Sequence, residues 1–182
     1  DFGKPLAELL ATLIKDAPTQ QGLKLPDGTK TIGLWAYPEE ANARTTVSVS
    51  ITDSQGRHLD FDLGITANQT WKYLEYDLAS FWSQSEPPYP LYLDIIYVRP
   101  ESAAGGAGSI QGVYFDDLQV RGSSSAGPVV IENFEDVGKW TIVTDDAPGS
   151  SPGPGAPTSR FISDKRIRHG GDSSGRLSWV GR

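Results

Sequence analysis

Apolar and polar positions alternate over most of the chain between residues 29 and 120. Six segments show this pattern, at residues 29–37, 45–52, 58–63, 71–78, 91–98 and 110–120. Successive side chains of a β-strand point to opposite faces of its sheet, so a period of two is typical of half-buried strands. The sequence Asp-Ser-Gln-Gly at 53–56 favours a tight turn, and it predicts a β-hairpin over residues 45–63.

One segment has helical spacing instead. Residues 5–15 place Leu and Ile at intervals of three and four after a Pro suited to a first helical turn, which predicts a short amphipathic helix. Runs rich in Pro or Gly at 86–90 and 103–108 separate the later strands. No strands alternate with helices, which excludes Rossmann and TIM-barrel architectures. The pattern therefore predicts an all-β sandwich or barrel with one short N-terminal helix.

Composition divides the chain into four parts. They are residues 1–20 with the helix, residues 21–121 as the sandwich body, residues 122–128 as a linker rich in Gly and Ser, and residues 129–182 as a C-terminal part. Within the last part, residues 145–158 hold too much Pro and Gly to pack, between strand-like segments on either side. We expect residues 129–182 to be either the opening strands of a second module or strands that complete the first sandwich.

Composition and charge exclude several functions. The 182 residues carry a formal net charge of -7, which makes nucleic acid a poor partner because its binding relies on clustered Lys and Arg. The chain has no Cys, which excludes disulfides, thiolate metal sites and Cys nucleophiles. No apolar run approaches the ~20 residues that cross a bilayer. Because Met and a signal-peptide start are also absent, we expect an excised piece of a larger extracytoplasmic protein, reaching a membrane only through parts outside this sequence.

Catalytic motifs of the hydrolase, metalloprotease, P-loop and dinucleotide-binding types do not occur. The two histidines, His58 and His169, have no nucleophile beside them in the sequence and are interpreted as turn residues that face solvent. A glycosidase needs two carboxylates about 5 to 10 Å apart, and the sequence leaves open a chance pair such as Asp94 with Glu75. The prediction is a protein that is not an enzyme.

Aromatic side chains are the candidates for ligand binding. The chain has five Trp and seven Tyr, and Trp35 and Tyr37 share one face of a predicted strand whose other face is aliphatic. If the aliphatic face is core, this pair lies on the opposite surface, where a ligand, the helix or a loop covers it. Trp82, beside a Pro-rich run, is the third candidate, either as an exposed binding residue or as an anchor for its loop. An aromatic plane suits the apolar face of a sugar ring.

Three segments, IGLWAYP at 32–38, WKYLEYDL at 71–78 and VYFDDLQV at 113–120, resemble the body of a galactose-binding-like jelly roll. This is the fold of many carbohydrate-binding modules. In that family the opening strand carries a Glu-rich segment with Phe or Trp, whereas the similar sequence here, Glu-Asn-Phe-Glu-Asp at 132–136, follows the body. With Gly-Pro-Val-Val before it, this sequence is also similar to the extracytoplasmic part of large bacterial ABC-transporter permeases.

The resemblance implies a jelly-roll-like β-sandwich and a structural calcium ion held by an opening-strand Glu and a closing-strand Asp. The corresponding residues are Glu132 or Glu135 and Asp116 or Asp117, whose oxygens suit Ca²⁺. Solvated carboxylates on exposed strand faces are the alternative. The resemblance also implies that Trp71 lies in the core.

The displaced opening strand has to pair somewhere, because an unpaired edge leaves backbone donors and acceptors open. We expect it to complete the sheet of its own chain, with exchange between two copies as the alternative. Together the residues and the resemblance predict a non-catalytic domain that binds a carbohydrate or a protein partner. A purely structural spacer is the second hypothesis, and an accessory or catalytic domain of a polysaccharide hydrolase is the third, because a fold alone does not establish a function.

Overall fold

The computed structural model describes residues 22–41, 43–82, 87–102, 110–122, 127–141 and 159–180. These residues form two antiparallel sheets that pack as a sandwich, so the predicted all-β sandwich is confirmed. The predicted helix at 5–15, most of the linker and the Pro- and Gly-rich stretch at 145–158 lie outside the described residues. No helix in the described part is long and apolar enough to span a membrane.

The smaller sheet has four strands in the order β1-β6-β3-β4. They are β1 (Leu23–Lys24), β3 (Arg44–Thr52), β4 (His58–Thr66) and β6 (Tyr92–Ser102). β3 and β4 form the predicted hairpin. The carboxylate of Asp53 accepts hydrogen bonds from the backbone amides of Gln55 (2.8 Å) and Arg57 (3.0 Å), which closes the turn between them.

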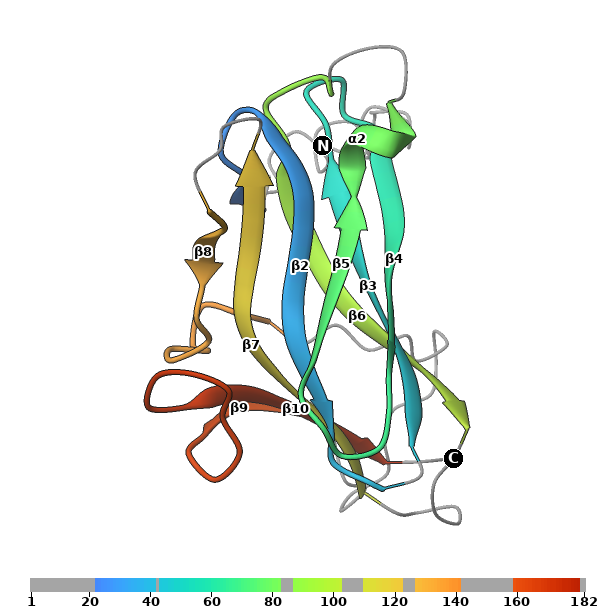
Figure 1. Cartoon of the computed structure of the whole chain (residues 1–182), viewed down its shortest axis with the longest axis vertical. Coiled ribbons are helices and arrows are strands. Elements are labelled where there is room, and N and C mark those ends of the chain that lie inside the picture. The colour runs from blue at the N-terminus through green and yellow to red at the C-terminus, as the bar shows by residue number, and fades with distance from the viewer. Residues whose placement is uncertain are drawn as a thin grey trace, which may run out of the picture.

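The larger sheet has six strands, five of them in the order β5-β2-β7-β10-β9, and β8 pairs with β7. They are β2 (Thr29–Pro38), β5 (Lys72–Asp77), β7 (Ile110–Gly122), β8 (Val129–Glu132), β9 (Arg160–Asp164) and β10 (Ser174–Val180). A short helix, α2 (Leu78–Phe81), follows β5 and is capped by the side chain of Asp77. In Figure 1 β2, β5 and β7 pass in front of β3 and β6, so the outer face of the larger sheet is toward the viewer.

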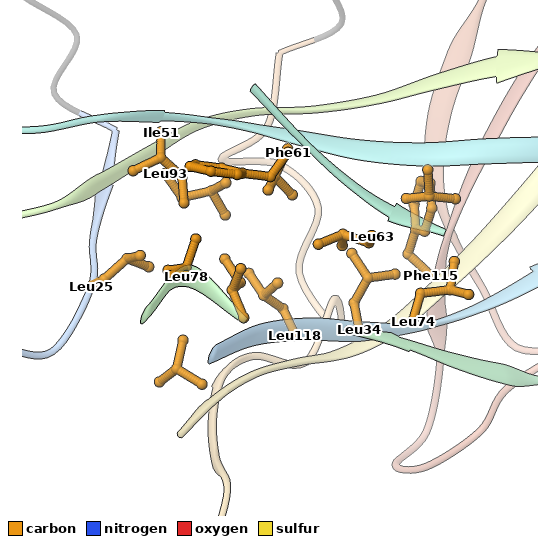
Figure 2. Packing of buried hydrophobic residues seen from close by; sticks show 14 of the residues in the cluster. Leu25, Leu34, Ile51, Phe61, Leu63, Leu74, Leu78, Leu93, Phe115 and Leu118 are labelled. Atoms are coloured by element: carbon orange, nitrogen blue, oxygen red, sulfur yellow. The ribbon is translucent and has the colours of Figure 1, made fainter. Parts of the chain in front are cut away.

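The core lies between the two sheets and follows from the alternation in the sequence. Every second side chain of β2 points inward, and Ile32 and Leu34 are fully buried. Figure 2 shows such side chains meeting residues of the facing sheet, among them Ile51 and Phe61. Burial of each large aliphatic side chain contributes about 1.5–3 kcal/mol, so this layer is the main source of stability.

Strand β7 joins the body to the C-terminal strands. Its first half pairs with β10, from Ile110 opposite Val180 to Phe115 opposite Gly175, and its second half pairs with β8. Between these halves the register with β2 shifts, and Asp117 adopts a positive φ of 42°. The shift is a β-bulge, which bends the strand. Within this chain, β8, β9 and β10 therefore lie in the same sheet as β2, β5 and β7.

Candidate functional site

The outer face of the six-stranded sheet carries a group of aromatic side chains. Trp35 and Tyr37 point away from the core, as the alternation of β2 predicted, and both are partly exposed. The ring of Tyr73 on β5 lies 5.4 Å from that of Trp35, and the ring of Trp71 lies 5.6 Å from that of Tyr37. We call Trp35, Tyr37, Trp71 and Tyr73 the aromatic face. The interpretation of Trp71 as a core residue was wrong, because it packs on this outer surface.

A histidine from the loop between β9 and β10 covers part of the aromatic face. The imidazole of His169 stacks on the indole of Trp35, with ring centroids 3.8 Å apart and planes 18° apart. It also meets Trp71 edge-on at 5.7 Å. His169 is an exposed loop residue, as the sequence predicted, but its side chain is only 30% exposed because one face of its ring packs on Trp35. A loop covers Trp35, which was one of the predicted alternatives.

Asp116 holds the His169 loop in place. Its carboxylate accepts hydrogen bonds from the backbone amides of His169 (2.9 Å), Gly170 (3.0 Å) and Asp117 (2.9 Å). Asp116 is 1% exposed. Burial raises the pKa of its carboxyl, and the amides of Gly170 and His169 offset that rise in part. The bulge at Asp117 therefore lies directly under the loop that this buried carboxylate fixes.

Three of the four carboxylates predicted as calcium ligands bond to groups of the protein itself. Glu132 accepts hydrogen bonds from the amide of Phe134 (2.8 Å) and lies 2.6 Å from the ammonium of Lys139. Glu135 accepts from the amide of Asp172 (2.7 Å) and from the hydroxyl of Ser173 (2.8 Å). Like Asp116, these two carboxylates bond to groups of the protein itself. Among the residues that the structure describes, no three His, Asp or Glu side chains are grouped as they would be around a metal ion.

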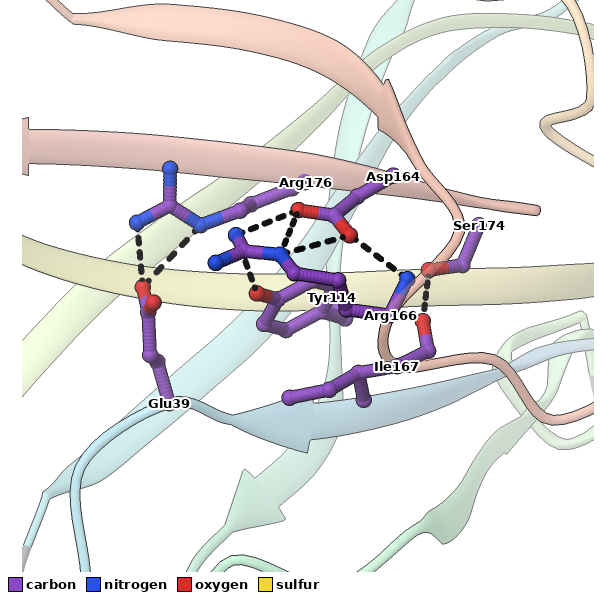
Figure 3. A network of polar contacts seen from close by, with 7 residues as sticks. All are labelled: Glu39, Tyr114, Asp164, Arg166, Ile167, Ser174 and Arg176. Atoms are coloured by element: carbon purple, nitrogen blue, oxygen red, sulfur yellow. Dashed lines mark hydrogen bonds and ion pairs between the residues drawn. The ribbon is translucent and has the colours of Figure 1, made fainter.

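One ion pair fastens β10 to the same face and a second one lies at the end of β9, as Figure 3 shows. Arg176 on β10 donates two hydrogen bonds to one carboxylate oxygen of Glu39, at 2.6 and 3.1 Å, and lies over the ring of Tyr114. Arg166 donates to Asp164 at 2.6 Å. The hydrogen bonds from Arg166 hold the pKa of Asp164 below its usual value. We call this part of the face, with the stack of His169 on Trp35, the closed half.

No loop that the structure describes covers the other part of the face in this way. Gln119 and Glu75 lie opposite Gly33 on its two neighbouring strands, and Tyr73 and Arg121 flank them. A Cβ atom on Gly33 would lie 2.7 Å from the Tyr73 hydroxyl, so the ring of Tyr73 lies directly against the backbone of β2. In Figure 1 no described segment is drawn across the upper parts of β2 and β7. We call these residues the open half.

Two further sequence-based candidates lie elsewhere. Trp82 is 9% exposed and packs in the core, where its ring is 6.2 Å from that of Phe61, so the expectation of an exposed binding residue was wrong. Asp94 bonds to Thr52 on the outer face of the four-stranded sheet, whereas Glu75 lies on the outer face of the six-stranded sheet. The carboxylate pair considered for a glycosidase is therefore separated by the whole sandwich.

Comparisons with protein-family models, with curated proteins and with solved structures found no match for this chain. Its own residues are therefore the guide to its function.

Proposed function

We propose that the chain is a non-catalytic domain of a larger extracytoplasmic protein, such as a membrane transporter or a cell-surface protein, and that its aromatic face binds carbohydrate. The observation that carries this proposal is the position of Tyr37, Trp71 and Tyr73. The core already fills the inner face of their sheet, so the sandwich does not require large rings on its outer face. Partly exposed rings in a group mark binding surfaces more often than isolated ones do.

Carbohydrate suits this surface because a pyranose ring has an apolar face that packs on an aromatic plane and hydroxyls that need polar partners around it. The polar partners stand beside the rings, on the strands that flank β2. The net charge of -7 favours a neutral or cationic ligand over an anionic one. Calcium is not needed for this proposal, because the contacts with a sugar come from aromatic rings and polar side chains.

The experiment is native affinity electrophoresis in gels that contain soluble neutral polysaccharides (a β-glucan, a galactomannan and an arabinoxylan) or acidic ones (polygalacturonate and alginate). We expect at least one neutral polysaccharide to retard the chain. Trp71→Ala should weaken the retardation about ten-fold, as expected for loss of an aromatic contact in a binding site.

The matched control is Phe81→Ala, which removes another exposed aromatic ring, 50% exposed on α2 and away from the aromatic face. This variant should be retarded like the wild type. Equal effects of the two substitutions would contradict a role for the aromatic face, and no retardation on any polysaccharide by a folded chain would contradict carbohydrate binding altogether.

A protein partner is the second candidate, and one observation favours it. Val129 and Val130 on β8 are 53% and 47% exposed, on a strand whose only partner among the described strands is β7. An exposed edge strand with β-branched side chains can accept a strand from another protein. A spacer that binds nothing is the third candidate, and it predicts neither retardation nor partner.

A further inference from the structure

The open half differs from the rest of the aromatic face in having polar groups available for a ligand. The amide of Gln119 has no hydrogen-bond partner among the residues that the structure describes. The closest contact of the Arg121 guanidinium with Glu75 is long, at 3.6 Å, and the two side chains are 50% and 33% exposed. Three polar groups therefore lie around Gly33: the amide of Gln119, the guanidinium of Arg121 and the carboxylate of Glu75. Each can form further hydrogen bonds with a ligand.

Tyr73 supplies the apolar part of the same site. Its ring is partly exposed, the hydroxyl end of the ring lies against the backbone at Gly33, and the hydroxyl donates to Glu75 at 3.2 Å. Burial, together with the charge of Glu75 and this hydrogen bond, raises the pKa of Tyr73 to about 12. The phenol is therefore neutral at physiological pH and serves as a hydrogen-bonding group at the edge of an apolar surface.

The charges in the open half identify the class of ligand. Glu75 and Arg121 neutralise each other, so the site has no net charge to attract a carboxylate or an ammonium group. Hydroxyl groups both donate and accept, and such groups match a Gln, a Glu and an Arg placed side by side. Charge-assisted hydrogen bonds donated by Arg121 and accepted by Glu75 would be the stronger contacts, and Gln119 would add specificity.

We infer that the open half, formed by Tyr73, Glu75, Gln119 and Arg121 around Gly33, binds one sugar unit of a neutral glycan. Tyr73 contacts the apolar face of the sugar, and the three polar side chains bond to its hydroxyls. This inference rests on the proposed function and assigns the binding position within the aromatic face. Trp35 is not the platform, because His169 already occupies its ring.

The test repeats the affinity electrophoresis with Gln119→Ala, Tyr73→Phe and Arg121→Gln, on whichever neutral polysaccharide retards the wild type. We expect Gln119→Ala and Arg121→Gln each to weaken binding about three- to ten-fold, in line with the loss of one or two hydrogen bonds. Tyr73→Phe keeps the ring and should weaken binding less, by about two- to three-fold. The matched control is Gln55→Ala, in the exposed turn between β3 and β4, which should bind like the wild type.

The possible failures are distinct. If no polysaccharide retards the folded wild type, the proposed function fails and this inference fails with it. If Trp71→Ala weakens binding but the Gln119, Tyr73 and Arg121 variants bind like the wild type, the proposed function stands and this inference is overturned. Retention on polygalacturonate or alginate alone would overturn the assignment to neutral glycans. Urea denaturation of each variant checks that it is folded.

Discussion

The closed and open halves lie on one face of one sheet, but they use their charged groups differently. In the closed half, Arg176 and Glu39 are only 15% and 27% exposed, and their contact is 2.6 Å. In the open half, Arg121 and Glu75 are 50% and 33% exposed, and their closest contact is 3.6 Å. An ion pair with short contacts and little exposure has its bonding capacity filled by the protein, whereas a loose, exposed pair retains capacity for a ligand.

The difference arises from the C-terminal strands. β10 pairs with the first half of β7 and not with its second half. The side chains of β10 and the loop before it therefore reach only that end of the face. Beyond the bulge at Asp117 the neighbour of β7 is β8, a strand of four residues. Residues 159–180 therefore stabilise one half of the face and leave the other accessible. Substitutions should therefore cost stability in the closed half and ligand binding in the open half.

The largest expected effect is that of Asp116→Ala on stability. This substitution leaves the amides of His169 and Gly170 without their acceptor and removes the anchor of the loop. We expect the free energy of unfolding, measured by urea denaturation, to fall by about 2–4 kcal/mol, since each unsatisfied buried donor costs about 1–3 kcal/mol.

The matched control for this prediction is Asp117→Asn. Asn tolerates the positive φ of this position, and the one contact of the Asp117 carboxylate with another described side chain is long, at 3.4 Å to His169. This substitution should change the free energy of unfolding by less than about 0.5 kcal/mol. If the two variants lost the same stability, Asp116 would not be the anchor of the His169 loop.

A smaller effect is expected in acid. Hydrogen bonds from Arg166 lower the pKa of Asp164, and hydrogen bonds from Ser173 and its neighbour Asp172 lower that of Glu135. A carboxyl with a lower pKa in the folded than in the unfolded chain stabilises the fold above its unfolded pKa, and this contribution is lost as the pH falls through the folded pKa. Stability from the closed half should therefore decline below about pH 4, where unfolded Asp and Glu take up protons.

The difference between the wild type and Asp164→Asn isolates this effect, because burial raises the pKa of Glu40 and of Asp116 and these two groups act in the opposite direction. Urea denaturation between pH 3 and pH 7 should show the variant less stable than the wild type at neutral pH and the two converging in acid. The control is Asp60→Asn, on the exposed face of β4. The difference in its free energy of unfolding from that of the wild type should be the same at every pH. A constant gap between the wild type and Asp164→Asn at every pH would contradict the prediction.

Local patterns predicted the strands and one surface of the site. The period of two in β2 places Trp35 and Tyr37 opposite the core without any knowledge of the partner strands. The neighbours of those rings could not be predicted, because they come from distant segments. Asp116 and His169 are 53 positions apart, and no local pattern links a carboxylate on a strand to the amides of a loop that far along the chain.

The positions of Trp82 and of the predicted calcium ligands also depend on contacts that local patterns do not encode. Trp82 directly follows α2, which is capped by Asp77, and its indole packs in the core. The Pro-rich sequence after Trp82 does not predict this burial. The carboxylates considered as calcium ligands find amides, a hydroxyl and Lys139 as partners instead. Open-half residues such as Gln119 became candidates only when the register placed them beside Gly33.

The central claim is that the ligand binds the open half together with the neighbouring ring of Trp71, and that the ion pairs of the closed half do not bind it. The most direct measurement is two-dimensional ¹H–¹⁵N NMR of the wild-type chain titrated with an oligosaccharide of the polysaccharide that retards it. The side-chain amide of Gln119 and the backbone amides of Gly33, Tyr73 and Arg121 should shift most, with little change at Arg176 or Asp164. Shifts centred on Arg176 and Asp164, or on the four-stranded sheet, would contradict the claim.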